Sequence, residues 1–192
     1  KRAICLGGAK NHMIVVPDAD QDSTAKGLLA SSMGSAGQRC MAASVAVGVA
    51  NIDPIIDQLV EEARNYKLGV DMGTIVSKAA LDRITNYIDE AEKMGAKILI
   101  DGRNATPPEG YENGYWLGAT ILDHVEPDWP SATDEIFGPV LSIIRKDNLE
   151  DAMQVENGNQ YGNAAAVFTT SGQVAKTISE SASAGMIGIN IG

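Results

Sequence analysis

The residues best suited to chemistry lie in the segment Ser35-Ala-Gly-Gln-Arg-Cys40, where a single cysteine follows a run of small residues. Ala36 and Gly37 let a backbone or a ligand approach closely, and Gly37 can adopt a strained conformation that presents the thiol. Arg39 places a positive charge beside Cys40, which favours the nucleophilic thiolate. Cys40 is therefore a candidate nucleophile, although a buried structural cysteine explains the same residues equally well.

A second candidate segment is Asp134-Glu-Ile-Phe-Gly-Pro-Val140, in which an acidic pair precedes an aromatic residue and a Gly-Pro turn. A carboxylate at the mouth of a strand can accept hydrogen bonds from sugar hydroxyls. A surface loop that leads into a strand explains the pattern as well, so this segment alone decides nothing.

Helices and strands alternate along the chain, and they must position both segments. Cys40 lies between a predicted helix over 20–33, capped by Ser23 or Asp22 and broken over 34–37, and a predicted strand over 44–50. This alternation predicts an α/β fold with a largely parallel sheet flanked by helices. The other expected strands cover 1–8, 13–16, 97–100, 117–122, 140–144, 164–168 and 186–191, and the other helices 53–67, 77–95, 148–156 and 173–182, with 101–114 and 127–133 irregular.

Composition excludes several classes of protein. The 192 residues hold 15 Lys and Arg against 25 Asp and Glu, which gives a net charge of -10 and no basic footprint for nucleic acid or anionic lipid. No apolar run approaches the roughly 20 residues that span a bilayer. Two cysteines, Cys5 and Cys40, form no disulfide framework, which indicates a reducing compartment. The two cysteines and two histidines match no zinc pattern, so we expect no metal site.

Taken together, in this order and separation, the motifs resemble the aldehyde dehydrogenase superfamily over essentially the whole chain. The resemblance implies that Cys40 is the catalytic nucleophile, that Glu135 hydrogen-bonds the ribose on the nicotinamide side of NAD, and that Phe137 packs near the nicotinamide. It gives Lys10 a chiefly structural role. The motifs are Leu6-Gly-Gly8, Lys10, Pro17-Asp-Ala-Asp20, Gly37-Gln-Arg-Cys40, Glu135-Ile-Phe-Gly-Pro139, Tyr161-Gly162 and Ala166-Val-Phe-Thr169.

A narrower resemblance points to the CoA-acylating methylmalonate-semialdehyde dehydrogenases. It rests on Gly8-Ala-Lys-Asn-His12, Gly37-Gln-Arg-Cys-Met-Ala42 and Gly110-Tyr-Glu-Asn-Gly114. Hydrolytic members of the superfamily carry a glutamate base four residues before the lysine, and here that position is Leu6, or Cys5 in a shifted alignment. Without a carboxylate base the enzyme should hydrolyse its thioester poorly, so a thiol acceptor such as coenzyme A makes chemical sense.

The resemblance implies oxidation of malonate or methylmalonate semialdehyde through a Cys40 thioester with NAD, then decarboxylation and acyl transfer to coenzyme A. Arg39, with its planar guanidinium, is the candidate for bidentate recognition of the substrate carboxylate; the alternatives are that it only tunes Cys40 or that it faces solvent. His12 is expected to shape the site or the cofactor cleft without being catalytic. Two rivals remain: another NAD-dependent aldehyde dehydrogenase, and a non-catalytic interaction or redox module that uses Cys5 and Cys40.

Residues 1–192 are expected to form the catalytic domain of a longer protein, excised from its NAD-binding domain and its C-terminal segment. On that interpretation the isolated domain folds but turns over little. The expected partners are a small aldehyde and further copies of the same chain in a homo-oligomer, with no nucleic acid and no membrane. The expected location is the cytoplasm, or the mitochondrial matrix in a eukaryote.

Overall fold

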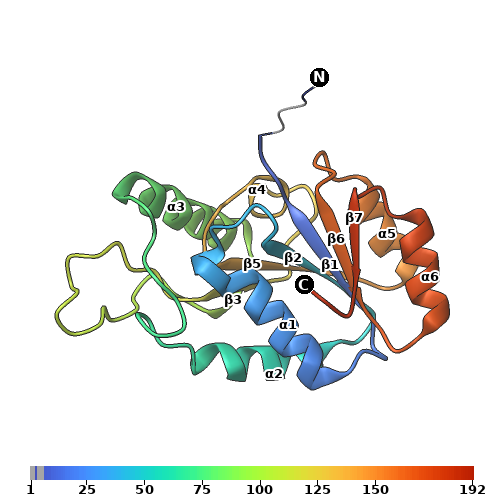
Figure 1. Ribbon diagram of the computed structural model, residues 1–192, viewed down its shortest axis with the longest axis horizontal. Helices are drawn as coiled ribbons and strands as arrows, with labels where there is room; N and C mark the ends of the chain where they lie inside the picture. The colour runs from blue at the N-terminus through green and yellow to red at the C-terminus, as the bar shows by residue number, and fades with distance from the viewer. Residues whose placement is uncertain (1–2, 4–6) are drawn as a thin grey trace.

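The computed structural model describes residue 3 and residues 7–192, and it folds into one sheet with helices on both faces (Figure 1). The expected strand over 1–8 lies largely outside these residues. The strands are β1 (Asn11–Val15), β2 (Ala43–Val49), β3 (Lys97–Ile100), β4 (Thr120–Asp123), β5 (Val140–Lys146), β6 (Ala164–Phe168) and β7 (Met186–Ile189). The helices are α1 (Gln21–Met33), α2 (Asp53–Arg64), α3 (Lys78–Met94), α4 (Pro130–Thr133), α5 (Leu149–Asn157) and α6 (Gly172–Ser181).

The sheet has seven strands in the order β3-β4-β5-β2-β1-β6-β7. Every neighbouring pair is parallel except β3 with β4, so the predicted α/β fold with a largely parallel sheet is confirmed. β1 lies between β2 and β6, with Met13 beside Ala46 on one side and Ala166 on the other. The first two strands therefore occupy the middle of the sheet, where burial is deepest.

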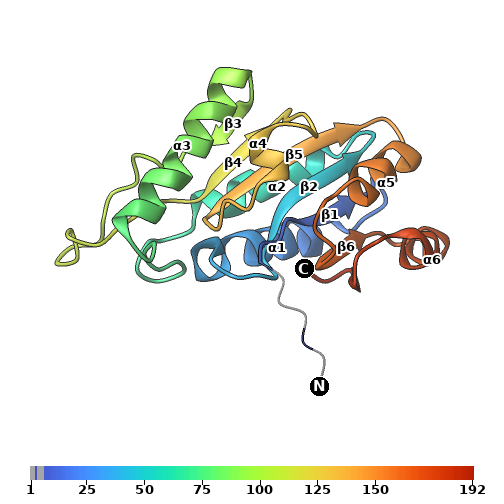
Figure 2. The ribbon, with the colours of Figure 1, turned by 90° about the horizontal axis from the view of Figure 1, so that it is seen from above.

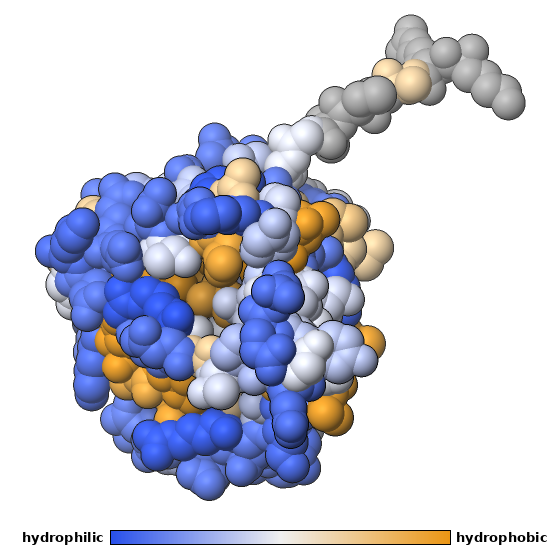
Figure 3. Space-filling view, turned by 90° about the vertical axis from the view of Figure 1, so that its left-hand side faces the viewer, coloured by the Kyte–Doolittle hydropathy of each residue, from blue (hydrophilic) through white to orange (hydrophobic). Residues whose placement is uncertain are grey.

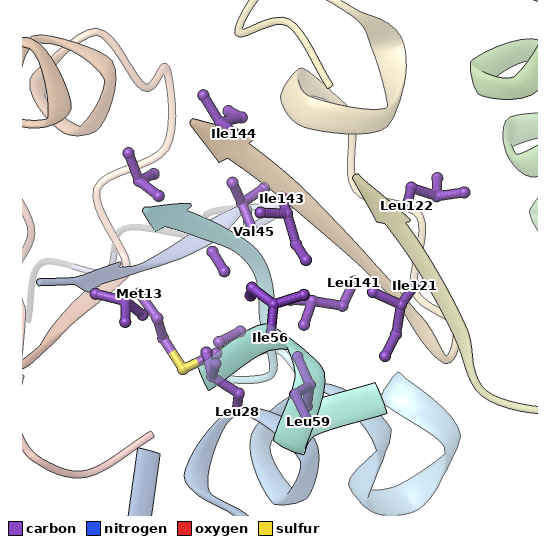
Figure 4. Packing of buried hydrophobic residues seen from close by; sticks show 14 of the residues in the cluster. Met13, Leu28, Val45, Ile56, Leu59, Ile121, Leu122, Leu141, Ile143 and Ile144 are labelled. Carbon is purple, nitrogen blue, oxygen red and sulfur yellow. The ribbon is translucent and has the colours of Figure 1, made fainter. Parts of the chain in front are cut away.

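Alternation along β1 separates the two faces of the sheet. The side chain of Met13 packs toward Leu28 of α1, in the layer that α1 and α2 form together (Figure 4). The preceding residue of β1, His12, lies against Glu156 of α5. Successive side chains of a strand point to opposite faces of the sheet. The helices α1 and α2 therefore cover one face, and α5 covers the other. Figure 2 gives the second view of this sandwich.

The helix boundaries follow local capping chemistry. Asp20 caps α1 by accepting a hydrogen bond from the Ser23 N–H, so the expected cap at Ser23 or Asp22 was wrong. The helix predicted over 77–95 is α3, which Ser77 caps and which Gly95 ends in the left-handed conformation. The segment 127–133, expected to be irregular, contains α4, whose first residue is proline.

The surface is polar on the side formed by α3 and the loop that follows β3. Figure 3 shows mainly hydrophilic residues there, with hydrophobic ones between them. In the part of the chain that the structure describes, no helix has the length and apolarity needed to cross a bilayer.

Candidate active site

The candidate nucleophile lies at the amino edge of the parallel strands. Residues 34–37 follow α1 directly, and Ser35, Ala36 and Gly37 have φ angles of 53°, 54° and 66°. Such a left-handed run costs roughly 1–2 kcal/mol for each residue with a Cβ atom. These residues connect α1 to the segment that contains Cys40, which lies just before β2 begins.

A close approach of two backbones joins the Cys40 loop to the second predicted segment. A Cβ atom on Gly37 would lie 2.0 Å from the Gly138 carbonyl oxygen, so only glycine fits. Across this contact Phe137 also has a positive φ, 55°, which is unusual for a bulky residue. Strained backbone of this kind concentrates at functional sites.

The four residues predicted from the sequence meet in one small cleft. Arg39, Cys40, Glu135 and Phe137 all line it, over a floor that includes Gly37. Cys40 is a free, exposed thiol and Glu135 is half-buried. Among the described residues, none donates a hydrogen bond to the Glu135 carboxylate. A nucleophile, a carboxylate and an aromatic ring from two distant segments therefore share one opening.

Arg39 is held differently from the expectation. Its Nη2 atom donates to the carbonyls of Ala30 (2.9 Å) and Ser31 (2.8 Å) in the last turn of α1. A guanidinium binds a carboxylate with two parallel hydrogen bonds either through Nη1 and Nη2 or through Nε and Nη2. Both pairs need Nη2, whose two hydrogens are already donated to α1. The bidentate contact that the sequence predicted is therefore not open in this arrangement, and only Nε and Nη1 can reach a ligand singly.

The backbone around Cys40 leaves its reactive groups free. In the described part of the chain the Cys40 N–H donates to no acceptor, while its carbonyl accepts from the side chains of Asn11 (2.9 Å) and Asn163 (2.8 Å). The sequence analysis missed both asparagines. Asn11 lies in the motif Gly8-Ala-Lys-Asn-His12, which gave it no role, and no sequence signal pointed to Asn163.

Lys10 is buried and directly follows Ala9, which lines the cleft. The side chain is 1% exposed, and among the described residues Nζ has no hydrogen-bond partner. Burial lowers the pKa of Lys10 to about 7, although the negative charges of Asp134 and Glu135 partly oppose this shift. Lys10 is thus a buried amine that the charges of Asp134 and Glu135 reach. The sequence analysis, which gave Lys10 a chiefly structural role, did not predict this.

His12 lies away from the cleft. Its Nδ1 is 2.8 Å from Glu156 Oε2, and the two side chains are 4% and 3% exposed. It lines a larger pocket, about 610 Å³, between the sheet and α5, which contains neither Cys40 nor Glu135. The expectation that His12 shapes the Cys40 site finds no contact to support it. Among residues 3 and 7–192 no group of three or more acidic, histidine or cysteine side chains is placed to hold a metal ion.

The chain is similar to known proteins over its whole length. All of residues 1–192 match the profile of the aldehyde dehydrogenase family. The chain belongs to the aldehyde dehydrogenase family. The malonate-semialdehyde dehydrogenase of Pseudomonas aeruginosa is 41% identical over the whole chain, and the human mitochondrial acylating methylmalonate-semialdehyde/malonate-semialdehyde dehydrogenase is also 41% identical.

A solved structure gives the same result in three dimensions. A Sinorhizobium meliloti protein, assigned as a methylmalonate-semialdehyde dehydrogenase and crystallised with NAD, superposes with a TM-score of 0.94 at 42% identity over 97% of this chain. The chain spans 40% of the length of the Pseudomonas relative and 37% of the human one. The expectation of a thiol acceptor rests on Cys5 and Leu6, and both lie outside the described residues.

The contact between Gly37 and Gly138 yields a direct test. Replacing Gly37 by alanine adds a Cβ atom against backbone, at a φ that disfavours side chains. We expect Gly37→Ala to lower the free energy of unfolding by about 2 kcal/mol or more and to slow Cys40 alkylation. Urea denaturation and peptide mapping measure both. Gly73→Ala is the control, because a Cβ there meets nothing within 4 Å; equal effects of the two changes would contradict the role of the contact.

Lys10 predicts a particular dependence of stability on pH. An unfolded lysine has a pKa of about 10.4, whereas that of folded Lys10 is lowered to about 7. Between these values the unfolded chain binds a proton that the folded chain does not, so stability rises with pH, by up to about 1.4 kcal/mol per unit. Lys10→Met removes this term. Relative to the variant, wild-type stability should rise from about pH 7 to 10; a pH-independent difference in denaturation would show that Lys10 stays charged.

Proposed function

We propose that this chain carries the catalytic machinery of an NAD-dependent, CoA-acylating dehydrogenase for malonate or methylmalonate semialdehyde. The observation that carries the proposal is the cleft in which Cys40, Glu135 and Phe137 meet. The names of the relatives give the substrate class. Because the chain spans only part of their length, we also propose that residues 1–192 form the catalytic part of a longer enzyme.

The residues at the cleft fit the nicotinamide end of NAD. The Glu135 carboxylate accepts no hydrogen bond from the described residues, so it is available to ribose hydroxyls, and Phe137 is 37% exposed, which leaves part of its ring open to stacking. When bound there, NAD supplies a hydride acceptor. The chain's own residues would hold the nicotinamide beside the carbon that Cys40 attacks.

In the proposed mechanism the Cys40 thiolate attacks the aldehyde carbon and forms a thiohemiacetal, whose oxyanion the free Cys40 N–H can stabilise. Loss of a hydride from that carbon leaves a thioester on Cys40. The substrate carboxylate then lies β to the thioester carbonyl, and its carbon–carbon bond breaks to release carbon dioxide through an enolate that takes up a proton. The thiol of coenzyme A takes the acyl group, and Cys40 leaves as thiolate.

Arg39 is the proposed contact for the substrate carboxylate, through a single hydrogen bond from Nη1 or Nε. Its charge also supports the Cys40 thiolate. The engagement of Nη2 by α1 favours one competing function: an acylating dehydrogenase for an uncharged aldehyde, without decarboxylation. We further propose a homo-oligomer, and a cytoplasmic or mitochondrial-matrix location, the latter because the human relative is named as mitochondrial.

The test is kinetic and uses the complete natural protein. Cys40→Ser should abolish NADH formation from malonate semialdehyde, and wild type should release carbon dioxide and NADH in equal amounts. Arg39→Leu should raise KM for this acidic aldehyde about 10- to 100-fold, the value of one charged hydrogen bond, and change that for propanal far less.

Two outcomes separate the alternatives. NADH formation by the Cys40→Ser variant would overturn the proposed function. The competing function, an acylating dehydrogenase for uncharged aldehydes, would be favoured by two results together. Arg39→Leu would change KM equally for both aldehydes, and wild type would form NADH without releasing carbon dioxide.

A further inference from the structure

The main-chain carbonyl of Cys40 accepts two hydrogen bonds from side chains that are distant in the sequence. Asn11 Nδ2 donates to it at 2.9 Å and Asn163 Nδ2 at 2.8 Å. A carbonyl oxygen has two lone pairs, and both are occupied here. The donors lie 29 and 123 positions away in the sequence, so neither bond belongs to a local turn.

The two asparagines stand at the amino ends of β1 and β6. Asn11 begins β1 and is 3% exposed, and its amide also donates to the Ala42 carbonyl at 2.9 Å, so both of its hydrogens are used. Asn163 is half-buried and directly precedes β6. Because β1 lies between β2 and β6, the amino ends of three adjacent strands meet at one carbonyl.

The rest of the loop is also fixed, but by other partners. Gln38 donates to the Thr74 carbonyl (3.1 Å) and accepts from the Val76 N–H (2.9 Å), and Arg39 is bound to α1. Within the described residues the groups of Cys40 that stay free are the thiol and the N–H, the two that the proposed chemistry needs.

We infer that Asn11 and Asn163 are positioning residues: they fix the Cys40–Met41 peptide so that the thiol and the Cys40 N–H keep one orientation toward the bound aldehyde. The inference rests on the proposed function, because it takes Cys40 to be the nucleophile. Neither asparagine touches the reacting atoms. Without these donors the peptide is held less firmly. The turn bond from the Ala42 N–H to the Arg39 carbonyl (3.0 Å) still spans it, but the Cys40 carbonyl itself then has no donor among the described residues.

Loss of this control should affect reaction more than binding. Misplacement of a reacting group by about 1 Å costs up to about 100-fold in rate. Substrate and cofactor affinity depend instead on Arg39, Glu135 and Phe137, with which neither asparagine shares a hydrogen bond. The expected signature is therefore a fall in the rate of the chemical step with nearly unchanged KM.

Asn163 is the better residue to change, since Asn11 is fully buried and its loss threatens folding. Asn163→Ala removes one donor from the Cys40 carbonyl. Asn163→Asp keeps the shape but presents a carboxylate, which only accepts hydrogen bonds at neutral pH and repels the carbonyl. Asn157→Ala is the matched control, because the Asn157 amide also donates to a main-chain carbonyl, that of Ser181 (3.0 Å), away from the cleft.

The experiment uses the complete natural protein with NAD and malonate semialdehyde, in the absence of coenzyme A. It measures the pre-steady-state burst of NADH and the melting temperature; KM for both ligands is measured separately, in the steady state with coenzyme A present. We expect Asn163→Ala to slow the burst about tenfold or more and Asn163→Asp to slow it further. KM should stay within about twofold, and Asn157→Ala should keep the wild-type burst rate.

Wild-type burst rates in both Asn163 variants would overturn the inference, as would an equal loss in Asn157→Ala at an equal fall in melting temperature. A raised KM with an unchanged burst would overturn it too, because that result assigns Asn163 to binding. The Cys40→Ser variant, measured in the same experiment, distinguishes failure of the proposed function from failure of this inference. A burst that persists in Cys40→Ser defeats the proposed function itself, whereas its loss there with normal Asn163 variants defeats only this inference.

Discussion

The site depends on one steric constraint, the contact between the backbones of Gly37 and Gly138. No side chain fits at Gly37, because a Cβ atom would lie 2.0 Å from the Gly138 oxygen. This contact places the loop before β2 against the loop before β5, and these strands are neighbours in the sheet. The thiol of Cys40 and the carboxylate of Glu135 thereby reach one cleft, although they are far apart in the sequence.

Around that contact the chain accepts unfavourable local states. Ser35, Ala36 and Phe137 have positive φ angles, and Lys10 is buried as an amine whose pKa is lowered to about 7. Each costs free energy, and the extensive core on both faces of the sheet offsets it. Among the described residues, Ser35, Ala36 and Phe137 are three of the six non-glycine residues with a positive φ; the other three, Ala50, His124 and Asn190, follow the carboxyl ends of β2, β4 and β7.

Much of this organisation was predictable from the sequence. Alternating helix and strand patterns placed all seven strands of the sheet approximately, and the motifs located Cys40, Arg39, Glu135 and Phe137. What the sequence could not give were contacts made through tertiary structure. The attachment of Arg39 to α1 and the two asparagines on the Cys40 carbonyl depend on which strands are neighbours, and no local pattern encodes strand order.

The central claim is that Cys40 carries the acyl group during the reaction. Its most direct test is peptide mass mapping of the complete natural protein after reaction with NAD and malonate semialdehyde, with coenzyme A left out. We predict that the peptide containing Cys40 gains the mass of one acetyl group, and that added coenzyme A removes it. NADH formation with no adduct on that peptide, or with an adduct on another residue, would contradict the account.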